Sequence, residues 1–331
     1  MRKKLKIAIL GATGVVGRNM LSELEKSGLD IAEIKLLASK RSVGRKMLFN
    51  GQEIEVEEAM DSSFRGMDVV FGAVKNDIAL RFIDAIRQSG ALFIDNSSAF
   101  RLNDDVPLVV VGVNDEDIFK HHGIIANPNC CTIIGLTAIA PIAKLSRIES
   151  MVVSTYQAVS GAGEAGMNEY NDELKAVANN EEYEPKAFSD QIVSNVIPKI
   201  GDILDNGYTK EEMKFQNEGR KIMHDEKLLV SCTCVRVPVL RSHSLSMTLN
   251  LEREVELDEV IDALKKSPVI SLPLDREAMP LYVSEKTYVE VSRIRKDLVN
   301  PKGISLWCVG DQILKGAAYN AVEILKKYIN G

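Results

Sequence analysis

The stretch Lys6-Ile-Ala-Ile-Leu10-Gly11-Ala-Thr-Gly14-Val-Val-Gly17 decides the fold of the N-terminal third of the chain. Its mostly apolar start predicts a buried strand, and residues 15–26 repeat apolar side chains at helical spacing. A glycine-rich turn between a strand and a helix is typical of a phosphate-binding loop. Gly11 suits the tight turn, Gly14 the approach of a pyrophosphate and Gly17 the packing of helix on sheet. The spacing is GxxGxxG, a variant of GxGxxG, and the alternative is a plain strand-to-helix turn.

Strands and helices alternate beyond this loop. We expect strands at residues 34–38, 68–74, 91–95, 108–111 and 124–126, a hairpin around Asn50-Gly51, and a helix at 78–88. This alternation predicts a parallel sheet covered by helices on both faces. From about residue 148 the strands are longer and alternate with period two, at residues 150–157, 228–239, 244–252, 288–294 and 304–309. They predict a large, mostly antiparallel sheet, interrupted by helices near 164–179 and 209–223. A last helix at 315–329 is expected to pack on the first domain.

Composition excludes several classes of protein. The 331 residues carry 41 Lys and Arg against 47 Asp and Glu, a net charge of −6, and only 5% aromatic residues. A nucleic-acid module is disfavoured, since the only basic block is the start, Met1-Arg-Lys-Lys. No apolar stretch approaches the ~20 residues of a membrane span, and the start lacks the pattern of a signal peptide. Five cysteines in apolar segments are no disulfide framework, so we expect a soluble cytoplasmic protein.

The end of the second strand indicates which nucleotide binds. An NAD site usually places Asp or Glu about 20 residues past the loop, to hold the ribose 2′-hydroxyl. Here residues 36–44 contain no acid, and Ser39, Arg41 and Ser42 stand there instead. A guanidinium suits the 2′-phosphate of NADP. The residues therefore favour NADP, and the alternative is a solvated basic loop.

A candidate nucleophile lies in Asn127-Pro-Asn129-Cys130-Cys131-Thr132, between an apolar strand and an apolar helix. A cysteine at a helix N-terminus faces unpaired N–H groups and the positive end of the helix dipole, which lower its pKa. The turn at Asn129 also offers N–H groups to an oxyanion. A buried apolar cysteine is the alternative for Cys130. Cys131, which points about 100° away around the helix, is predicted to be a small packing residue.

The partner base is one of four histidines. His121, His122 and His224 occupy polar segments typical of the surface, whereas His243 lies between two strong strand patterns. A thiolate and an imidazole beside a nucleotide loop indicate oxidation of an aldehyde, or its reverse, through a thioester.

Seven motifs in order along the chain resemble one family. They are Gly11-Ala-Thr-Gly-Val-Val-Gly17, Ser39-Lys-Arg-Ser-Val-Gly44, Asn96-Ser-Ser-Ala-Phe-Arg101, Asn127-Pro-Asn-Cys130, Ser154-Thr-Tyr-Gln157-Ala-Val-Ser-Gly-Ala-Gly163, Glu218-Gly-Arg-Lys221 and residues 236–243. Over essentially its whole length the sequence resembles the aspartate-β-semialdehyde dehydrogenase family. The resemblance implies a Rossmann-type NADP-binding domain, residues 1–128 with 312–331. It also implies an α+β catalytic and dimerisation domain, residues 129–311, in a homodimer or homotetramer.

The resemblance also implies the roles of individual residues. Cys130 is the nucleophile, His243 the acid/base group and Gln157 a residue that positions the substrate. Arg236 binds the α-carboxylate of the substrate and Glu218 its amino group. Arg101 and Lys221 bind the phosphate, and Asn129 also contacts the substrate. The implied NADP site consists of Gly11, Thr13, Gly14, Val15, Val16, Ser39, Arg41, Ser42, Ser160, Gly161 and Gln312. No metal is implied. The family commonly has serine or threonine where this chain has Cys131.

The implied reaction is the NADPH-dependent reduction of L-4-aspartyl phosphate to L-aspartate 4-semialdehyde, which supplies lysine, methionine and threonine biosynthesis. A related alternative is N-acetyl-γ-glutamyl-phosphate reductase, which uses the same thioester chemistry but needs no acid for a free amino group. Glyceraldehyde-phosphate dehydrogenase is disfavoured because its Ser-Cys-Thr-Thr-Asn pattern is absent from the sequence. A non-catalytic NADP-sensing paralogue is the alternative from another class, disfavoured by the presence of both Cys130 and His243.

Overall fold

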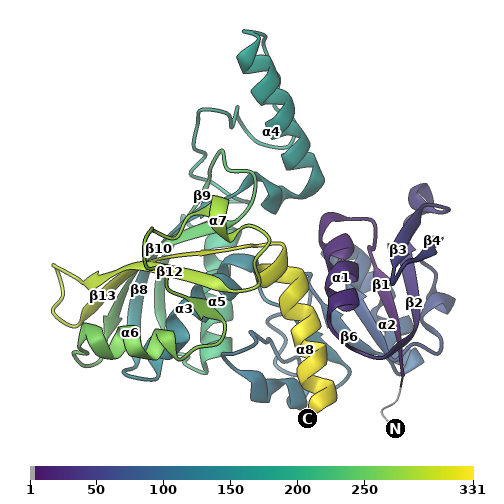
Figure 1. Ribbon diagram of the computed structural model, residues 1–331, viewed down its shortest axis with the longest axis horizontal. Helices are drawn as coiled ribbons and strands as arrows, with labels where there is room; N and C mark the ends of the chain where they lie inside the picture. Colours follow the sequence, from purple (N-terminus) through teal and green to yellow (C-terminus); the bar gives the residue numbers. More distant parts are fainter. Residues whose placement is uncertain (1–3) are drawn as a thin grey trace. The chain divides into compact units, whose positions relative to one another are not determined.

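The computed structural model describes residues 4–331, so most of the basic start, residues 1–3, lies outside it. The chain forms two compact units (Figure 1). Unit 1 comprises Met1–Asn129 and Ala317–Gly331, and unit 2 comprises Cys130–Gly316. Among the described residues, no helix combines the length and apolar character needed to span a membrane.

Unit 1 is built on a seven-stranded sheet in the order β3-β4-β2-β1-β5-β6-β7. All neighbouring strands are parallel except the hairpin of β3 and β4, which turns at Asn50-Gly51 as predicted. Apart from the exposed Lys6, the residues of the central strands β1 and β5 are buried, as expected for a parallel sheet. The strands are β1 (Leu5–Leu10), β2 (Ile31–Ala38), β3 (Lys46–Phe49), β4 (Gln52–Glu58), β5 (Val69–Gly72), β6 (Leu92–Asp95) and β7 (Ile124–Ala126).

The predicted strand at 108–111 is wrong. Leu108 makes only an isolated bridge to Ala126. The N–H of Val109 still bonds to the Ala126 carbonyl at 3.1 Å. The two N–H groups after it bond to side chains instead: Val110 donates to Asn114 Oδ1 and Val111 to Asn320 Oδ1, both at 3.0 Å. Side-chain amides that capture the N–H groups prevent a strand ladder from continuing.

The helices of unit 1 are α1 (Val15–Lys26), α2 (Asn76–Ser89) and α8 (Tyr319–Asn330), with short 3₁₀ turns η1 (Lys40–Ser42), η2 (Asp61–Phe64) and η3 (Asp115–Lys120). The last helix packs on unit 1 as predicted, against α1 and η3. It begins with a π-helical turn, η5 (Leu314–Ala318). Asn320, on α8, is fully buried and donates to Asn127 Oδ1 at 2.7 Å, which ties the last helix to the segment before Cys130.

Unit 2 contains a six-stranded sheet in the order β11-β12-β13-β10-β8-β9. Three neighbouring pairs are antiparallel, and two, β8 with β9 and β11 with β12, are parallel. The predicted mostly antiparallel sheet is therefore present with parallel pairs at its edges. The strands are β8 (Ile148–Gln157), β9 (Leu229–Arg236), β10 (His243–Leu251), β11 (Ile270–Ser271), β12 (Val289–Lys296) and β13 (Gly303–Gly310).

The helices of unit 2 are α3 (Cys130–Ala143), α4 (Gly163–Ala178), α5 (Lys210–Met223), α6 (Leu257–Lys265) and α7 (Pro280–Val283), and η4 (Val159–Ala162) is a 3₁₀ turn. Helix α3 is buried on all sides and contacts β10, β12 and β13. Helix α5 covers β9 and starts with a capping box, in which Thr209 and Glu212 each accept the other's backbone N–H. In Figure 1, α4 extends away from the sheet of unit 2.

Candidate active site

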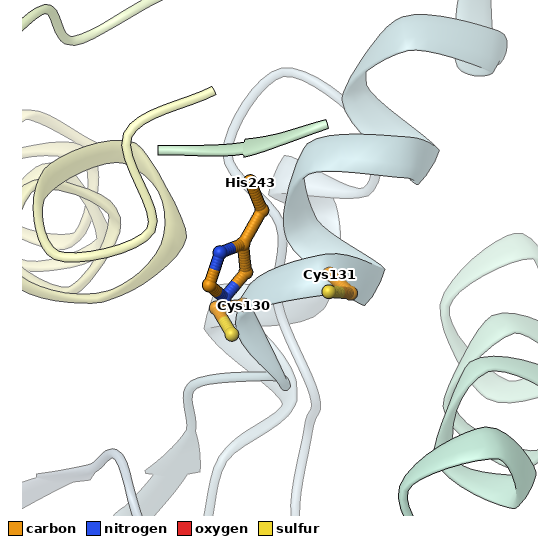
Figure 2. A group of neighbouring side chains, drawn as sticks. All are labelled: Cys130, Cys131 and His243. Atoms are coloured by element: carbon orange, nitrogen blue, oxygen red, sulfur yellow. The ribbon is translucent and has the colours of Figure 1, made fainter. Parts of the chain in front are cut away.

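Cys130 is the first residue of α3 (Figure 2). A hydrogen bond from the Cys131 thiol holds the pKa of Cys130 well below its ordinary value. The charge of His243 lowers it further, while burial and Glu211 act in the opposite direction. The position at the positive end of the helix dipole favours the thiolate in the same way. Cys130 is thus suited to be a nucleophile.

Cys131 is 2% exposed, which agrees with the predicted packing role. Burial raises the pKa of Cys131 well above its usual range, and the neighbouring Cys130 adds to this. Cys131 therefore stays a thiol while Cys130 ionises, and it can act as the hydrogen-bond donor. The geometry thus assigns Cys131 more than packing.

His243 is fully buried at the start of β10, and Figure 2 shows its ring beside Cys130. A ring nitrogen of His243 and the Sγ atoms of Cys130 and Cys131 all lie within 4.8 Å of one another. Nδ1 accepts a hydrogen bond of 3.0 Å from the N–H of Ala158. In its neutral form the ring therefore carries its proton on Nε2, which is buried. His243 is arranged to donate a hydrogen bond from Nε2 into the site.

The same three side chains offer the donor types of a metal site, but their surroundings do not fit one. A histidine that ligates a metal normally donates its second N–H to an acceptor. His243 instead accepts at Nδ1, from the Ala158 N–H, so Nε2 bears the proton in the neutral ring. This hydrogen-bond pattern suits a hydrogen bond from Nε2 to a substrate rather than coordination of a metal.

Arg236, the last residue of β9, and His243 both form a hydrogen bond with the backbone of Ala158. The carbonyl of Ala158 accepts from Arg236 Nη1 at 2.7 Å. A Cβ atom on Gly161 would lie 2.8 Å from Arg236 Nη1 and 3.2 Å from His243 Nε2, so these predicted residues are brought together. Arg236 is 7% exposed, and burial lowers the pKa of its guanidinium, although the charge of Cys130 opposes this. Such a buried cation suits an anionic group of a substrate.

Gln157, the last residue of β8, is held by two neighbours. Its Oε1 accepts from Thr155 Oγ1 at 2.9 Å, and its Nε2 donates to Glu211 Oε1 at 3.4 Å. Glu211 also forms an ion pair with Lys214 at 2.8 Å. The sequence analysis missed Glu211, although a signal was present. Glu211, Lys214, Glu218 and Lys221 recur at spacings of 3, 4 and 3, which places them on one face of α5.

Ser160 and Gln312, predicted at the cofactor, lie together in unit 2. Gln312 Nε2 donates to Ser160 Oγ, and Gln312 Oε1 accepts from the N–H of Ser242 at 2.8 Å. These bonds connect η4 to the residue that precedes His243. Both residues are buried, so the connection is stable against competition from water.

Arg101 and Asn129, predicted at the substrate, belong to unit 1 and are buried. Arg101 donates from Nε to the carbonyl of Asn127 at 3.0 Å and from Nη2 to the carbonyl of Asn96 at 2.8 Å. These bonds fix its guanidinium against the segment that leads to Cys130.

The glycine loop of unit 1 excludes side chains at two positions. Gly11 has φ +90°, and a Cβ there would lie 2.4 Å from the carbonyl oxygen of Ala73. At Gly17 a Cβ would lie 2.2 Å from the carbonyl oxygen of Gly11, so Gly17 makes room for the loop itself and not for the sheet. The loop leads into α1, whose first turn has no hydrogen bond from a capping side chain. Thr13 Oγ1 donates to Ser42 Oγ at 3.4 Å, which places the 39–42 turn beside the loop. This arrangement fits a dinucleotide phosphate.

Two family models match the chain. Residues 6–121 match the semialdehyde dehydrogenase NAD-binding domain, and residues 139–315 match the semialdehyde dehydrogenase dimerisation domain. The chain belongs to the semialdehyde dehydrogenase family. The predicted resemblance and fold class are thereby confirmed.

Comparisons with individual proteins narrow the family further. Aspartate-semialdehyde dehydrogenase of Aquifex aeolicus is 44% identical, over 96% of each chain, and that of Bacillus subtilis is 42% identical, over 98% of this chain and 97% of its own. The crystal structure of aspartate semialdehyde dehydrogenase II of Vibrio cholerae, complexed with ASA, superposes with a TM-score of 0.97 at 37% identity, covering 99% of each chain. The alternatives of an N-acetyl-γ-glutamyl-phosphate reductase and a sensing paralogue gain no support from these relatives.

Proposed function

We propose that this protein catalyses the reversible, NADP-dependent interconversion of L-4-aspartyl phosphate and L-aspartate 4-semialdehyde. The observation that carries the proposal is the Cys130 thiol of lowered pKa beside a His243 ring whose Nδ1 is held by the Ala158 N–H. Relatives of 44% and 42% identity with the name aspartate-semialdehyde dehydrogenase support the choice of substrate.

The chemistry follows from these residues. The Cys130 thiolate attacks the acyl carbonyl; a carbon–sulfur bond forms, the carbon–oxygen bond to phosphate breaks, and a thioester remains. Bound NADPH supplies the hydride. As the aldehyde forms, the carbon–sulfur bond breaks and the sulfur leaves as the thiolate, to which His243 Nε2–H can donate a hydrogen bond. A lowered pKa serves both steps, because the thiolate attacks at neutral pH and leaves readily.

We assign the groups of the substrate to individual charged side chains. In unit 2 we assign the α-carboxylate to Arg236, whose planar fork matches a carboxylate. Glu218 is assigned to the amino group and Lys221 to phosphate. Glu218 is buried, and both lie on the face of α5 that carries Glu211. That Arg101 binds the phosphate and that Asn129 contacts the substrate remain predictions.

NADP is the proposed cofactor. The glycine loop and the N-terminus of α1 would hold its pyrophosphate, and Ser39, Arg41 and Ser42 its 2′-phosphate. Support comes from the absence of an acid at this turn and from the exposed guanidinium of Arg41. A related structure, the aspartate semialdehyde dehydrogenase with NADP from Candida albicans, has a TM-score of 0.77 and 25% identity.

We also propose that the protein forms a homodimer in the cytoplasm. The match of residues 139–315 to a dimerisation domain supports assembly. The face of the unit 2 sheet that points away from α3 carries exposed Val152, Tyr156 and Leu229. All five cysteines are free, as expected in a reducing compartment.

The decisive test is an assay for phosphate-dependent reduction of NADP by aspartate semialdehyde, with N-acetylglutamate semialdehyde as the competing substrate. We expect turnover of the first and not the second.

Cys130→Ser should abolish turnover but keep NADP affinity, because serine forms no thiolate at neutral pH. His243→Asn should lower kcat by roughly 10²–10⁴. Substantial activity of Cys130→Ser, or preference for the acetylated substrate, contradicts the proposal.

A further inference from the structure

Two buried glutamates of α4 hold a segment that has no helix or strand of its own. Glu169 is 4% exposed, and its Oε2 accepts from the N–H groups of Lys186, at 2.7 Å, and Ala187. Its Oε1 accepts from the N–H of Phe188 at 2.9 Å. Three consecutive backbone donors on one carboxylate fix the path of the chain at this point, because charge-assisted hydrogen bonds are short and strong.

Glu173, one turn later on α4, continues this clamp. It is fully buried, and its Oε2 accepts from the N–H groups of Ile192 at 2.8 Å and Val193 at 3.0 Å. Together Glu169 and Glu173 hold five backbone N–H groups of residues 186–193. The segment is therefore ordered by side chains of α4 and not by a backbone ladder.

The clamped segment reaches Arg236 at two places. Ile197 and Arg236 exchange backbone hydrogen bonds of 2.9 and 2.8 Å. The ring centre of Phe188 lies 5.8 Å from the guanidinium carbon of Arg236, within the range of a cation–π interaction. On the other side, Arg236 Nη1 donates to the Ala158 carbonyl at 2.7 Å. A long side chain with several rotamers is thus restrained from its backbone to its charged end.

We propose that Glu169 and Phe188 are positioning residues for Arg236. They hold its guanidinium in the orientation that receives the α-carboxylate, and so they determine the preference for aldehydes that carry this group. The inference rests on the proposed function, because it takes the carboxylate as the partner of Arg236. Neither residue belongs to the motifs from which the site was predicted.

The test compares two substrates that differ by one group. Aspartate semialdehyde carries the α-carboxylate, and 3-aminopropanal is the same aldehyde without it. We expect Phe188→Leu to raise KM for aspartate semialdehyde roughly tenfold with a smaller change in kcat, since a guanidinium displaced by about 1 Å loses its alignment. The kcat/KM for 3-aminopropanal should stay unchanged. Phe188→Tyr retains the ring and should behave like the wild type.

Glu169→Gln provides the second variant, since an amide cannot accept three N–H groups as a carboxylate does. It should lower the preference for aspartate semialdehyde in the same way. The matched control is Asp172→Asn, an exposed carboxylate of the same helix whose partner is Lys175 at 3.4 Å. If Glu169→Gln does not fold, Phe188→Leu decides alone.

Each outcome has a distinct meaning. If Phe188→Leu lowers kcat/KM equally for both substrates, or for neither, the positioning role is overturned, while the function of Arg236 stays intact. A wild-type enzyme that fails to prefer aspartate semialdehyde over 3-aminopropanal overturns the carboxylate role of Arg236, and this inference with it. The alkylation rate of Cys130 without substrate should be equal in all variants, and a slower rate would show general damage to the site in place of a positioning effect.

Discussion

Ala158 holds two functional side chains through its own backbone. Its N–H donates to His243 Nδ1 and its carbonyl accepts from Arg236 Nη1. Since both bonds come from the main chain, no substitution of Ala158 other than proline, which lacks the N–H, removes either group. A single residue therefore sets the proton position on the proposed acid and the orientation of the proposed carboxylate ligand.

Cys131 should control the ionisation of Cys130. Cys131→Ala removes the thiol donor, so the pKa of Cys130 should rise and its alkylation by iodoacetamide at pH 7 should slow roughly tenfold. Cys131→Ser should react and turn over much like the wild type, because a hydroxyl also donates. The rate is measured against pH, with peptide mapping to locate the modified sulfur. Equal rates for the Ala variant and wild type at pH 7, or modification mainly at Cys131, contradict this assignment.

Arg41 should decide the choice of cofactor. It is exposed on η1, next to Ser42, which accepts from Thr13 of the glycine loop. Arg41→Ala should weaken NADP binding far more than NAD binding, since only NADP has a 2′-phosphate to lose. Titration of both nucleotides by fluorescence or calorimetry measures this. An equal loss for both would mean that Arg41 only supports the loop.

At the scale of elements, the carboxyl end of β6 contains an unusual carboxyl group. Asp95 is fully buried, and burial raises its pKa to about 6, although hydrogen bonds from Ser97 and the charge of Arg101 oppose the shift. The end of β6 thus contains a carboxyl group that titrates near neutral pH and is close enough to Arg101, the residue predicted to bind phosphate, to be affected by its charge. Its burial costs stability when it ionises.

Asp95→Asn should change the pH dependence of stability. The folded state binds the proton more tightly than the unfolded state, so protonation stabilises the fold in acid, and this contribution disappears as pH rises from about 4 to about 6. The full contribution is roughly 3 kcal/mol in acid, of which about 1 kcal/mol remains at pH 5. Relative to Asp95→Asn, the wild type should lose about 1 kcal/mol of unfolding free energy between pH 5 and 7.5. Urea denaturation measures it, with Asp84→Asn on the exposed side of α2 as the control. A constant difference between the two proteins would contradict the raised pKa.

At the scale of the whole molecule, part of one sheet face of unit 2, along β8, is exposed. Along β8 the odd-numbered residues Met151, Val153 and Thr155 are buried, while Val152 is 54% exposed and Tyr156 38%. The Tyr156 ring lies 5.2 Å from that of Trp307 on the same face. Exposed apolar side chains in a contiguous arrangement indicate an interaction surface. A second copy of the chain is the occupant that fits a dimerisation domain.

Charges on this face should prevent assembly. We expect Val152→Glu with Tyr156→Glu to give a monomer in sedimentation velocity, because two like-charged faces would each bury unpaired carboxylates. The control is Leu298→Glu with Val299→Glu, which changes two apolar residues that are even more exposed, at the turn between β12 and β13. It should remain a dimer. A monomeric wild type, or a double variant at 152 and 156 that still dimerises, contradicts the proposed interface.

Local patterns were enough to predict the two kinds of sheet, the glycine loop, the return of the last helix to unit 1 and the position of Cys130 at a helix start. These features depend on residues close together in the chain, where periodicity, turn chemistry and helix ends act directly. The strand expected at 108–111 failed because Asn320, more than 200 residues away, takes one of its N–H groups. No local pattern reports such a partner.

By itself, the sequence determined the fold class, the family and the residue types available for thioester chemistry. Only the tertiary structure decided which of them meet. It placed the Ala158 N–H on His243, 85 residues away, brought Glu211 to Gln157 and set Phe188 against Arg236. The physical reason is that side-chain hydrogen bonds and ring contacts depend on distances of a few ångströms between distant segments. Those distances are set by packing of the whole unit and not by any spacing along the chain.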